Sequence, residues 1–445
     1  MMHLQNLAPF FLAIAAVACA GTRDAGTASP LPGSPDNPVT RVPATVAASP
    51  DSQVAAAAAP AKSAPTPSPI TTATSTPAAT TPARALSAGS HPTSPVLDSL
   101  MRGTLAARGL YVFRYAVNNR RLKHLIGISD STEINALVID VKDEFGLNFA
   151  SSDPLLRKNA GSQANIRNMK ELVDTIRAHG ILPIARIVVF KDSVAARVNP
   201  EHVIRQPDGS PWRDKQGLSW VNPYANEIWE YNLRVGDEAI RMGFGEIQFD
   251  YIRFPEPYRS LPRQVFPGQK GRSKPQVLAE FLSAARARYA KAGIRTTADV
   301  FGLVTTVNGP LEIGQSWEPL ARAVDVMLPM VYPSHYPRGA FNIERPNAQP
   351  YDIIHLAISR ARERNEKLGI TGEHVRPWLQ AFSIGAPKYG PRELEEQKRA
   401  VYDAGYDGWV MWEPGSRYDV FLPGLEKTFV SRKKVPPVPR AKRGE

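Results

Sequence analysis

Short apolar runs alternate with amphipathic stretches along most of the chain, from about residue 108 to residue 430. The runs are rich in β-branched and aromatic residues, which is typical of buried strands. Eight such runs predict strands at residues 110–117, 135–143, 182–190, 246–254, 295–303, 325–333, 376–384 and 408–414.

The stretches between the runs have the spacing of helices with one apolar face. In residues 165–180 the apolar positions Ile166, Met169, Leu172, Val173 and Ile176 share one side, and a glycine follows as a stop signal. Further stretches of this kind lie at residues 226–243, 275–293, 350–365 and 391–405. Strands that alternate with helices predict parallel βαβ units.

Eight such units predict an α/β fold, a (β/α)₈ TIM barrel over residues 105–430. The alternative is an open, doubly wound sheet. No glycine-rich phosphate loop follows the first predicted strand, which disfavours a dinucleotide-binding version of that sheet.

The first 100 residues have a different composition. An apolar run from Leu7 to Ala18 is too short to span a bilayer but suits the core of a signal peptide. Residues 1–19 resemble a bacterial lipoprotein signal that ends at Cys19, the only cysteine of the chain. The alternative is ordinary export with cleavage near Ala18 or Ala20. A lone cysteine leaves the folded part without a disulfide in either case.

Residues 20–100 consist largely of Ala, Thr, Pro and Ser, which bury too little apolar surface to offset the entropy of ordering. We expect a disordered tether there and a basic disordered tail at residues 431–445. The chain has a net charge of +12, to which this tail contributes. No nucleic-acid-binding module is recognisable, so we expect no nucleic-acid partner. The lipoprotein-like signal leads us to expect a membrane contact through a lipid on Cys19. The oligomeric state is not indicated, and we assume a monomer.

Ionisable residues gather where the predicted strands end. The stretch "EIQFDYIRFP" is an example, since Asp250 and Arg253 follow directly on a buried strand. In a barrel of this class the active site forms at the carboxyl ends of the strands. Ten residues near these ends are expected to bind substrate: Asp140, Lys142, Arg186, Lys191, Gln248, Arg253, Tyr332, His335, Gln380 and Trp412.

The side chains of a strand alternate between its two faces. Gln248 and Asp250 are therefore expected on one face, as are Asp140 and Lys142. The structural alternative for Asp250 is a buried ion pair with Arg253 or Lys142.

Asp250 and Asp299 end neighbouring strands and so form a candidate catalytic pair. Hydrolysis of a glycoside uses two carboxyl groups, one as proton donor and one as nucleophile or base. Aromatic faces that help to bind sugar rings are available at Tyr258, Trp317, Tyr336, Trp378 and Trp412, and the loop at 206–224 adds Trp212 and Trp220. No two histidines have metal-ligand spacing beside the mouth, so we expect neither a metal nor a cofactor.

Several motifs together resemble one bacterial family. They are "IDVKDEFG", "PIARIVVFKD", "DGSPWRDKQGLSWVNPY", "EIQFDYIRFP", "ADVFG", "MLPMVYPSHY" and "GWVMWEP". The family is a "putative glycoside hydrolase" domain of unknown function, viewed as a distant relative of the α-amylase-like barrels. The resemblance implies a nucleophile role for Asp250. Asp299 stands near the position at which α-amylase-like barrels carry the acid. Glu413 stands where the resemblance leads us to expect an asparagine, so it is a second candidate for the acid.

The sequence thus predicts an exported glycoside hydrolase of the cell envelope that acts on a polysaccharide or glycan. Secretion without an anchor is the alternative location, and a glycan-binding barrel without catalysis is the alternative function.

The lipid anchor is testable with one substitution. We expect Cys19→Ala to move the protein from the detergent phase to the aqueous phase in a phase-partition assay, because the acylated side chain is lost. A wild-type protein that also stays in the aqueous phase would contradict the lipoprotein interpretation.

Overall fold

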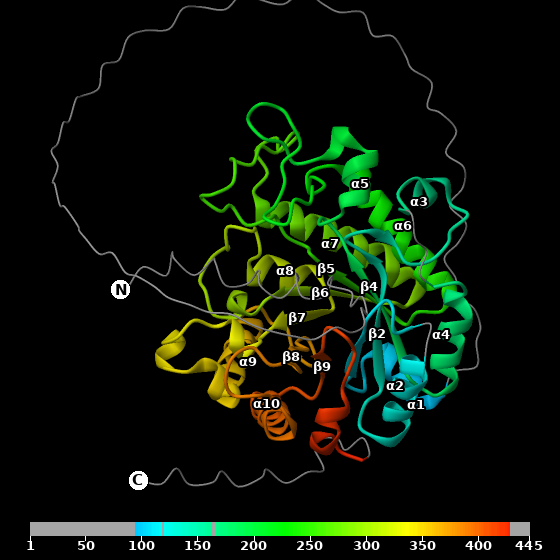
Figure 1. Ribbon diagram of the computed structural model, residues 1–445, viewed down its shortest axis with the longest axis vertical. Coiled ribbons are helices and arrows are strands. Elements are labelled where there is room, and N and C mark those ends of the chain that lie inside the picture. Colours follow the sequence, from blue (N-terminus) through cyan, green and yellow to red (C-terminus); the bar gives the residue numbers. More distant parts are fainter. Residues whose placement is uncertain (1–93, 118–119, 162–165, 428–445) are drawn as a thin grey trace, which may run out of the picture. The chain divides into compact units, whose positions relative to one another are not determined.

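The computed structural model describes residues 94–117, 120–161 and 166–427 (Figure 1). The predicted signal peptide, Cys19, most of the predicted tether and the basic tail lie outside these residues.

Eight parallel strands form a closed ring, which confirms the predicted TIM barrel. The order is β1-β9-β8-β7-β6-β5-β4-β2, and β1 closes the ring by pairing with β2. The strands are β1 (Arg108–Val112), β2 (Ala136–Asp143), β4 (Leu182–Val188), β5 (Glu246–Asp250), β6 (Arg295–Phe301), β7 (Val326–Met330), β8 (Trp378–Gln380) and β9 (Trp409–Trp412). A short antiparallel strand, β3 (Gly146–Leu147), extends from β2.

Most of the strands end earlier than predicted. β5 was expected to reach residue 254 but ends at Asp250, because Tyr251 adopts a left-handed backbone conformation with φ of 49°. This conformation interrupts the extended chain. The residues that follow Asp250 therefore belong to a loop, and strand alternation does not apply to them.

Helices surround the ring (Figure 1). They are α1 (Pro95–Arg102), α2 (Arg120–Ser131), α3 (Pro154–Lys158), α4 (Met169–Ala178), α5 (Ser193–Val198), α6 (Asn226–Met242), α7 (Lys274–Tyr289), α8 (Trp317–Ala323), α9 (Pro350–Lys367) and α10 (Pro391–Asp403). The apolar side predicted for α4 is buried, as shown by Met169, Leu172, Val173 and Ile176.

The apolar core has two parts, which strand alternation separates. Leu137 and Ile139 of β2 belong to the part between strands and helices. Ala136 and Val138 of the same strand belong to the smaller part inside the ring. Alternate residues of β2 thus pack against the helices and inside the ring, as the two-residue period of a strand requires.

Helix α1 closes the amino-terminal end of the barrel. Leu97 and Leu100 are fully buried and belong to the cluster inside the ring, and the Arg295 side chain donates to the carbonyl of Leu100 at 3.0 Å. Ser94 caps the helix by accepting a hydrogen bond from the N–H of Leu97. The tether predicted to end at residue 100 is corrected here, since residues 95–100 are part of the folded barrel.

We expect Leu100→Ala to lower the free energy of unfolding by about 2–5 kcal/mol, because it opens a cavity in the floor of the barrel. Val96→Ala on the same helix is the matched control, since Val96 is 51% exposed. Urea denaturation of both variants measures the difference. Equal, small effects would mean that α1 is not part of the cooperative unit.

Candidate active site

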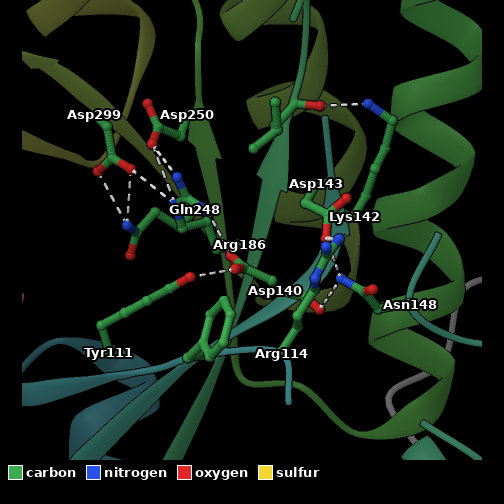
Figure 2. Close-up of polar contacts among 12 residues, drawn as sticks. Tyr111, Arg114, Asp140, Lys142, Asp143, Asn148, Arg186, Gln248, Asp250 and Asp299 are labelled. Atoms are coloured by element: carbon green, nitrogen blue, oxygen red, sulfur yellow. Dashed lines mark hydrogen bonds and ion pairs between the residues drawn. The ribbon is translucent and has the colours of Figure 1, made fainter. Parts of the chain in front are cut away.

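Five polar side chains from neighbouring strands meet at the carboxyl end of the barrel (Figure 2). They are Tyr111 of β1, Asp140 of β2, Arg186 of β4, Asp250 of β5 and Asp299 of β6. The strands run in parallel, so their carboxyl ends lie at the same edge, and the register pairs Asp140 with Arg186 directly.

Arg186 lies at the centre of this group. Its Nη1 donates to Oδ1 of Asp140, while its Nη2 and Nε both donate to Oδ2 of Asp250. The Tyr111 hydroxyl donates to the other oxygen of Asp140 at 2.6 Å. We call Arg186, Asp140, Asp250 and Asp299 the Arg186 cluster.

The geometry of Arg186 limits the separation of the two candidate catalytic carboxylates. Its Nε lies 3.2 Å from Oδ2 of Asp250 and 3.8 Å from Oδ2 of Asp299. The two oxygens are therefore at most about 7 Å apart. Carboxyl groups of glycosidases are separated by roughly 5–5.5 Å in retaining enzymes and by roughly 6.5–9.5 Å in inverting ones.

Asp299 lies deeper than Asp250. Its side chain has no exposed surface, whereas that of Asp250 is 11% exposed. The Gln248 amide donates to both oxygens of Asp299 at 3.0 Å, and the Trp378 indole donates to Oδ1 at 2.7 Å. Burial and the adjacent charge of Asp250 raise the pKa of Asp299 well above its usual range. The raised pKa favours a proton on Asp299.

The other members of the cluster stabilise this charge distribution. Burial raises the pKa of Asp140, although Arg186 and the hydrogen bond from Tyr111 act against it. Burial lowers the pKa of Arg186, but the carboxylates of Asp140 and Asp250 outweigh it and raise that pKa well above the usual value. Arg186 therefore stays positively charged between two carboxylates.

The backbone just after Asp250 is strained. Tyr251 has φ of 49°, and its N–H donates to Oδ1 of Asp250. A bulky side chain rarely adopts this conformation, and such strain concentrates at functional sites. The turn holds the Asp250 carboxylate by one oxygen while Arg186 holds the other.

An aromatic wall lies beyond the strands on one side of the mouth. It consists of Tyr332, His335, Phe382 and Trp412. Tyr332 stacks on Trp412 at 5.7 Å between ring centroids, and Phe382 meets Trp412 edge to face at 5.2 Å. Phe382 and Trp412 are partly exposed. Burial lowers the pKa of His335 to about 4, so the ring is neutral near pH 7.

Lys142 does not join Asp140 at the mouth, which corrects the prediction from strand alternation. The register of β2 shifts between Asp140 and Lys142, as in a β-bulge. Lys142 is fully buried, forms an ion pair with Asp192 at 2.8 Å and lies 5.3 Å from the ring centroid of Tyr231 on α6. Its side chain therefore points to the helix layer.

Glu413 and Gln380, two further predicted site residues, form hydrogen bonds with neighbouring loops. The Glu413 carboxylate accepts hydrogen bonds from the N–H groups of Gly415 and Arg417 and pairs with the Arg417 side chain, all within one loop. Gln380 has no exposed surface, and its Oε1 accepts from the N–H of Ser334 at 3.0 Å. These contacts give both side chains a structural role and leave neither directed at the Arg186 cluster.

The basic residues after β4 and β5 support the loops around the mouth. Arg253 pairs with Glu256 at 3.0 Å and stacks on Trp220 at 5.1 Å, so it is not the partner of Asp250. The Lys191 ammonium group donates to Gln216 at 2.7 Å. Neither residue bonds to a member of the Arg186 cluster among the residues that the structure describes.

Most of the aromatic residues proposed as sugar platforms are buried instead. Trp212, Trp220, Trp317, Trp378 and Tyr336 each expose 5% or less of their surface. Trp378 still serves the site, since its indole N–H holds Asp299. Of the predicted platforms, only Tyr258 and Trp412 are partly exposed.

Two residues that were not among the sequence-based candidates belong to the mouth. Tyr111 bonds to Asp140, and its place on the inward face near the end of β1 could have indicated this. Glu144 directly follows β2 and is partly exposed. Burial and then the charge of Asp143 raise the pKa of Glu144, while Lys191 and Arg186 lie near enough to act against the rise.

Neither a metal cluster nor a membrane span is found in the described part of the chain. Residues 94–117, 120–161 and 166–427 contain no group of three His, Cys, Asp or Glu side chains arranged for a metal, and no helix there has the length and apolarity to cross a bilayer. A surface cavity of about 700 Å³ lies against α2, but its lining includes no carboxylate.

The raised pKa of Asp299 predicts a pH-dependent loss of stability. In the unfolded chain the carboxyl group titrates near pH 4, so above that pH the folded state holds a proton that the unfolded state has released. The free energy of unfolding then falls as the pH rises, by at most about 1.4 kcal/mol per pH unit, up to the folded pKa. Asp299→Asn removes this loss.

We therefore expect the stability of Asp299→Asn relative to the wild type to increase as the pH rises above about 4 in urea denaturation. Glu395→Gln, on the outer helix α10, controls for removal of an exposed carboxylate. A stability difference that is constant with pH would contradict the raised pKa.

The chain was compared with families, curated proteins and solved structures. No curated protein matches the chain. Among solved structures, it is similar to the PgaB (BpsB) glycoside hydrolase domain from Bordetella bronchiseptica, with 15% identity, a TM-score of 0.51, and coverage of 70% of this chain and 95% of that one. It is also similar to a hypothetical protein from Ruminiclostridium thermocellum, with 34% identity, a TM-score of 0.40, and coverage of 43% and 97%. The family model described as "putative glycosyl hydrolase domain" matches residues 109–418, and the chain belongs to this family.

Proposed function

We propose that this protein hydrolyses glycosidic bonds in an envelope or extracellular polysaccharide, with the Arg186 cluster as its catalytic centre. Membership of the family supports a glycoside hydrolase-like domain. The observation that carries the proposal is the pair of carboxyl groups, Asp250 and Asp299, that Arg186 holds within about 7 Å at the mouth of the barrel. A much wider gap would have favoured a barrel that only binds glycan.

Asp250 is the carboxylate that faces the anomeric carbon in this proposal. It is the more exposed of the pair, and its two oxygens are oriented by Arg186 and by the Tyr251 N–H. A fixed negative charge stabilises the oxocarbenium-like transition state, either as a nucleophile or through space. Protonation of Asp299 keeps a second negative charge away from it.

The proton donor needs access to the leaving oxygen. Asp299 has a suitably raised pKa, but its side chain is completely buried beneath Gln248 and Trp378. Glu144 is partly exposed at the same end of the barrel and also has a raised pKa. We therefore assign proton donation to Glu144, and the role of a buried, protonated neighbour to Asp299.

We infer the location from the amino-terminal sequence. A lipoprotein-like signal and a long Ala/Thr/Pro/Ser-rich segment before the barrel support an enzyme tethered at the cell envelope. A polysaccharide within reach of such a tether is the substrate class that we propose.

We expect Asp250→Asn to lower kcat by roughly 10²–10³-fold, because it removes the charge that faces the anomeric carbon while keeping nearly the same shape. A panel of 4-nitrophenyl glycosides and release of reducing ends from envelope polysaccharides measure the turnover. Glu395→Gln is the control and should keep full activity. A folded Asp250→Asn protein with wild-type turnover would refute the assignment.

The same panel separates the proton donors. An acid matters least when the departing group needs no proton, so Glu144→Gln should lose little activity on aryl glycosides with good leaving groups and much more on polysaccharide. If Asp299→Asn or Glu413→Gln shows that pattern and Glu144→Gln does not, the donor is that residue instead.

A further inference from the structure

Two aromatic side chains are exposed at the same end of the barrel as the Arg186 cluster. Tyr115 lies three residues after β1 and is 50% exposed, and Phe145 lies two residues after β2 and is 37% exposed. Among the large hydrophobic side chains that are exposed in the described residues, these two are the only aromatic ones. Both are at the carboxyl ends of neighbouring strands, on the same end of the barrel as Asp250.

Arg114 orders the two rings. Its guanidinium carbon lies 4.8 Å from the ring centroid of Tyr115 and 5.2 Å from that of Phe145. The same group forms an ion pair with Asp143 at 2.7 Å, and Asn148 donates to Asp143 at 3.1 Å (Figure 2). We call Arg114, Tyr115, Asp143 and Phe145 the Arg114 platform.

The platform is held from the backbone as well. The N–H of Phe145 donates to Oδ1 of Asp143 at 2.8 Å, so the ring and the ion pair belong to one turn. The side chain of Arg114 is only 17% exposed and that of Asp143 only 7%, whereas the rings that they support face solvent. Two rings fixed before binding lose little side-chain entropy when a ligand stacks on them.

The chemistry of the platform suits a sugar ring. The C–H face of a pyranose is apolar and stacks on aromatic rings, while its hydroxyl groups require hydrogen-bonding partners at the edge. Arg114, which is 17% exposed, supplies N–H donors beside the rings, and Asp143 balances its charge. A membrane surface is disfavoured, because the paired charges of Arg114 and Asp143 leave no net positive charge beside the rings to attract anionic lipids.

The platform is continuous with the candidate active site through β2. Asp140 of the Arg186 cluster and Asp143 of the platform are three residues apart on this strand, which corresponds to about 10 Å. A chain of sugars that occupies the site at Asp250 could therefore extend along the strand direction to the platform.

We propose that the Arg114 platform is an outer subsite that binds a sugar residue of an extended polysaccharide, away from the bond that is cleaved at Asp250. The inference rests on the proposed function, which it refines to a polymer-acting hydrolase. Tyr115 and Phe145 contact the sugar, and Arg114 positions them.

The test compares a polymer with a monosaccharide substrate. Tyr115→Ala and Phe145→Ala should each raise KM for a cleaved polysaccharide by roughly 3- to 10-fold, since a well-placed aromatic stack contributes about 0.5–1.5 kcal/mol. Turnover of a 4-nitrophenyl monosaccharide should stay within about 2-fold of the wild type. Tyr115→Phe should retain the wild-type KM, and Val420→Ala, at a site 63% exposed, is the control for removing exposed apolar surface.

Equal effects on both substrates, or no effect on either, would overturn the subsite. A second measurement uses the Asp250→Asn protein in native gels that contain glycol chitin, a soluble β-glucan or peptidoglycan fragments. Retardation that is lost with Tyr115→Ala and Phe145→Ala supports the subsite, and unchanged retardation refutes it.

The two proposals can fail separately. Loss of retardation with the platform variants, while Asp250→Asn keeps full turnover, would sustain the subsite and refute the catalytic assignment. No retardation and no turnover on any of these glycans would count against both. If the wild type binds phosphatidylglycerol vesicles and the platform variants do not, the platform binds a membrane and the glycan subsite is refuted.

Discussion

A single guanidinium group, that of Arg186, allows three carboxyl groups to remain close together inside the end of the barrel. Its hydrogen bonds go to Asp140 and Asp250, and Asp299 lies 3.8 Å from its Nε. Carboxylates buried without a partner are strongly unfavourable, and removal of one member of a buried ion pair typically costs about 3–5 kcal/mol. With one positive charge for three acids, the cluster favours a proton on the most buried of them, which is Asp299.

The inward face of β5 places further polar side chains in the interior of the barrel, and each of them also needs a partner. Glu246, Gln248 and Asp250 all point inward and are buried, where many barrels of this class place branched apolar residues. Each has its own partner: Glu246 pairs with Arg295 and Arg376, Gln248 bonds to Asp299, and Asp250 bonds to Arg186.

The rest of the interior is apolar. Its side chains come from the other strands and from helix α1 and pack beside the polar residues of β5. Val138 of β2, Ile184 of β4 and Leu328 of β7 fill the ring, and Leu97 and Leu100 close its floor. The helix that the sequence placed in a tether thus adds apolar surface to an interior to which β5 supplies little. The same strand therefore bears on stability and on the proposed chemistry, since β5 carries Asp250 as well as the buried polar residues Glu246 and Gln248.

The strands, the barrel and the gathering of acids at its mouth could be predicted from the sequence alone. Strand and helix periodicity are local properties, and parallel strands bring their carboxyl ends to one edge whatever the details of packing. The order of the strands was therefore sufficient to place Asp250 and Asp299 near each other. The side-chain partners could not be predicted in this way. A shift in register turned Lys142 away from Asp140, a local loop engaged Glu413, and the pairing of β4 with β5 gave Asp250 the partner Arg186 in place of Arg253. The contacts of Lys142 and Asp250 depend on the register between strands far apart in the chain, and those of Glu413 on the conformation of one loop, so only the tertiary structure decides them.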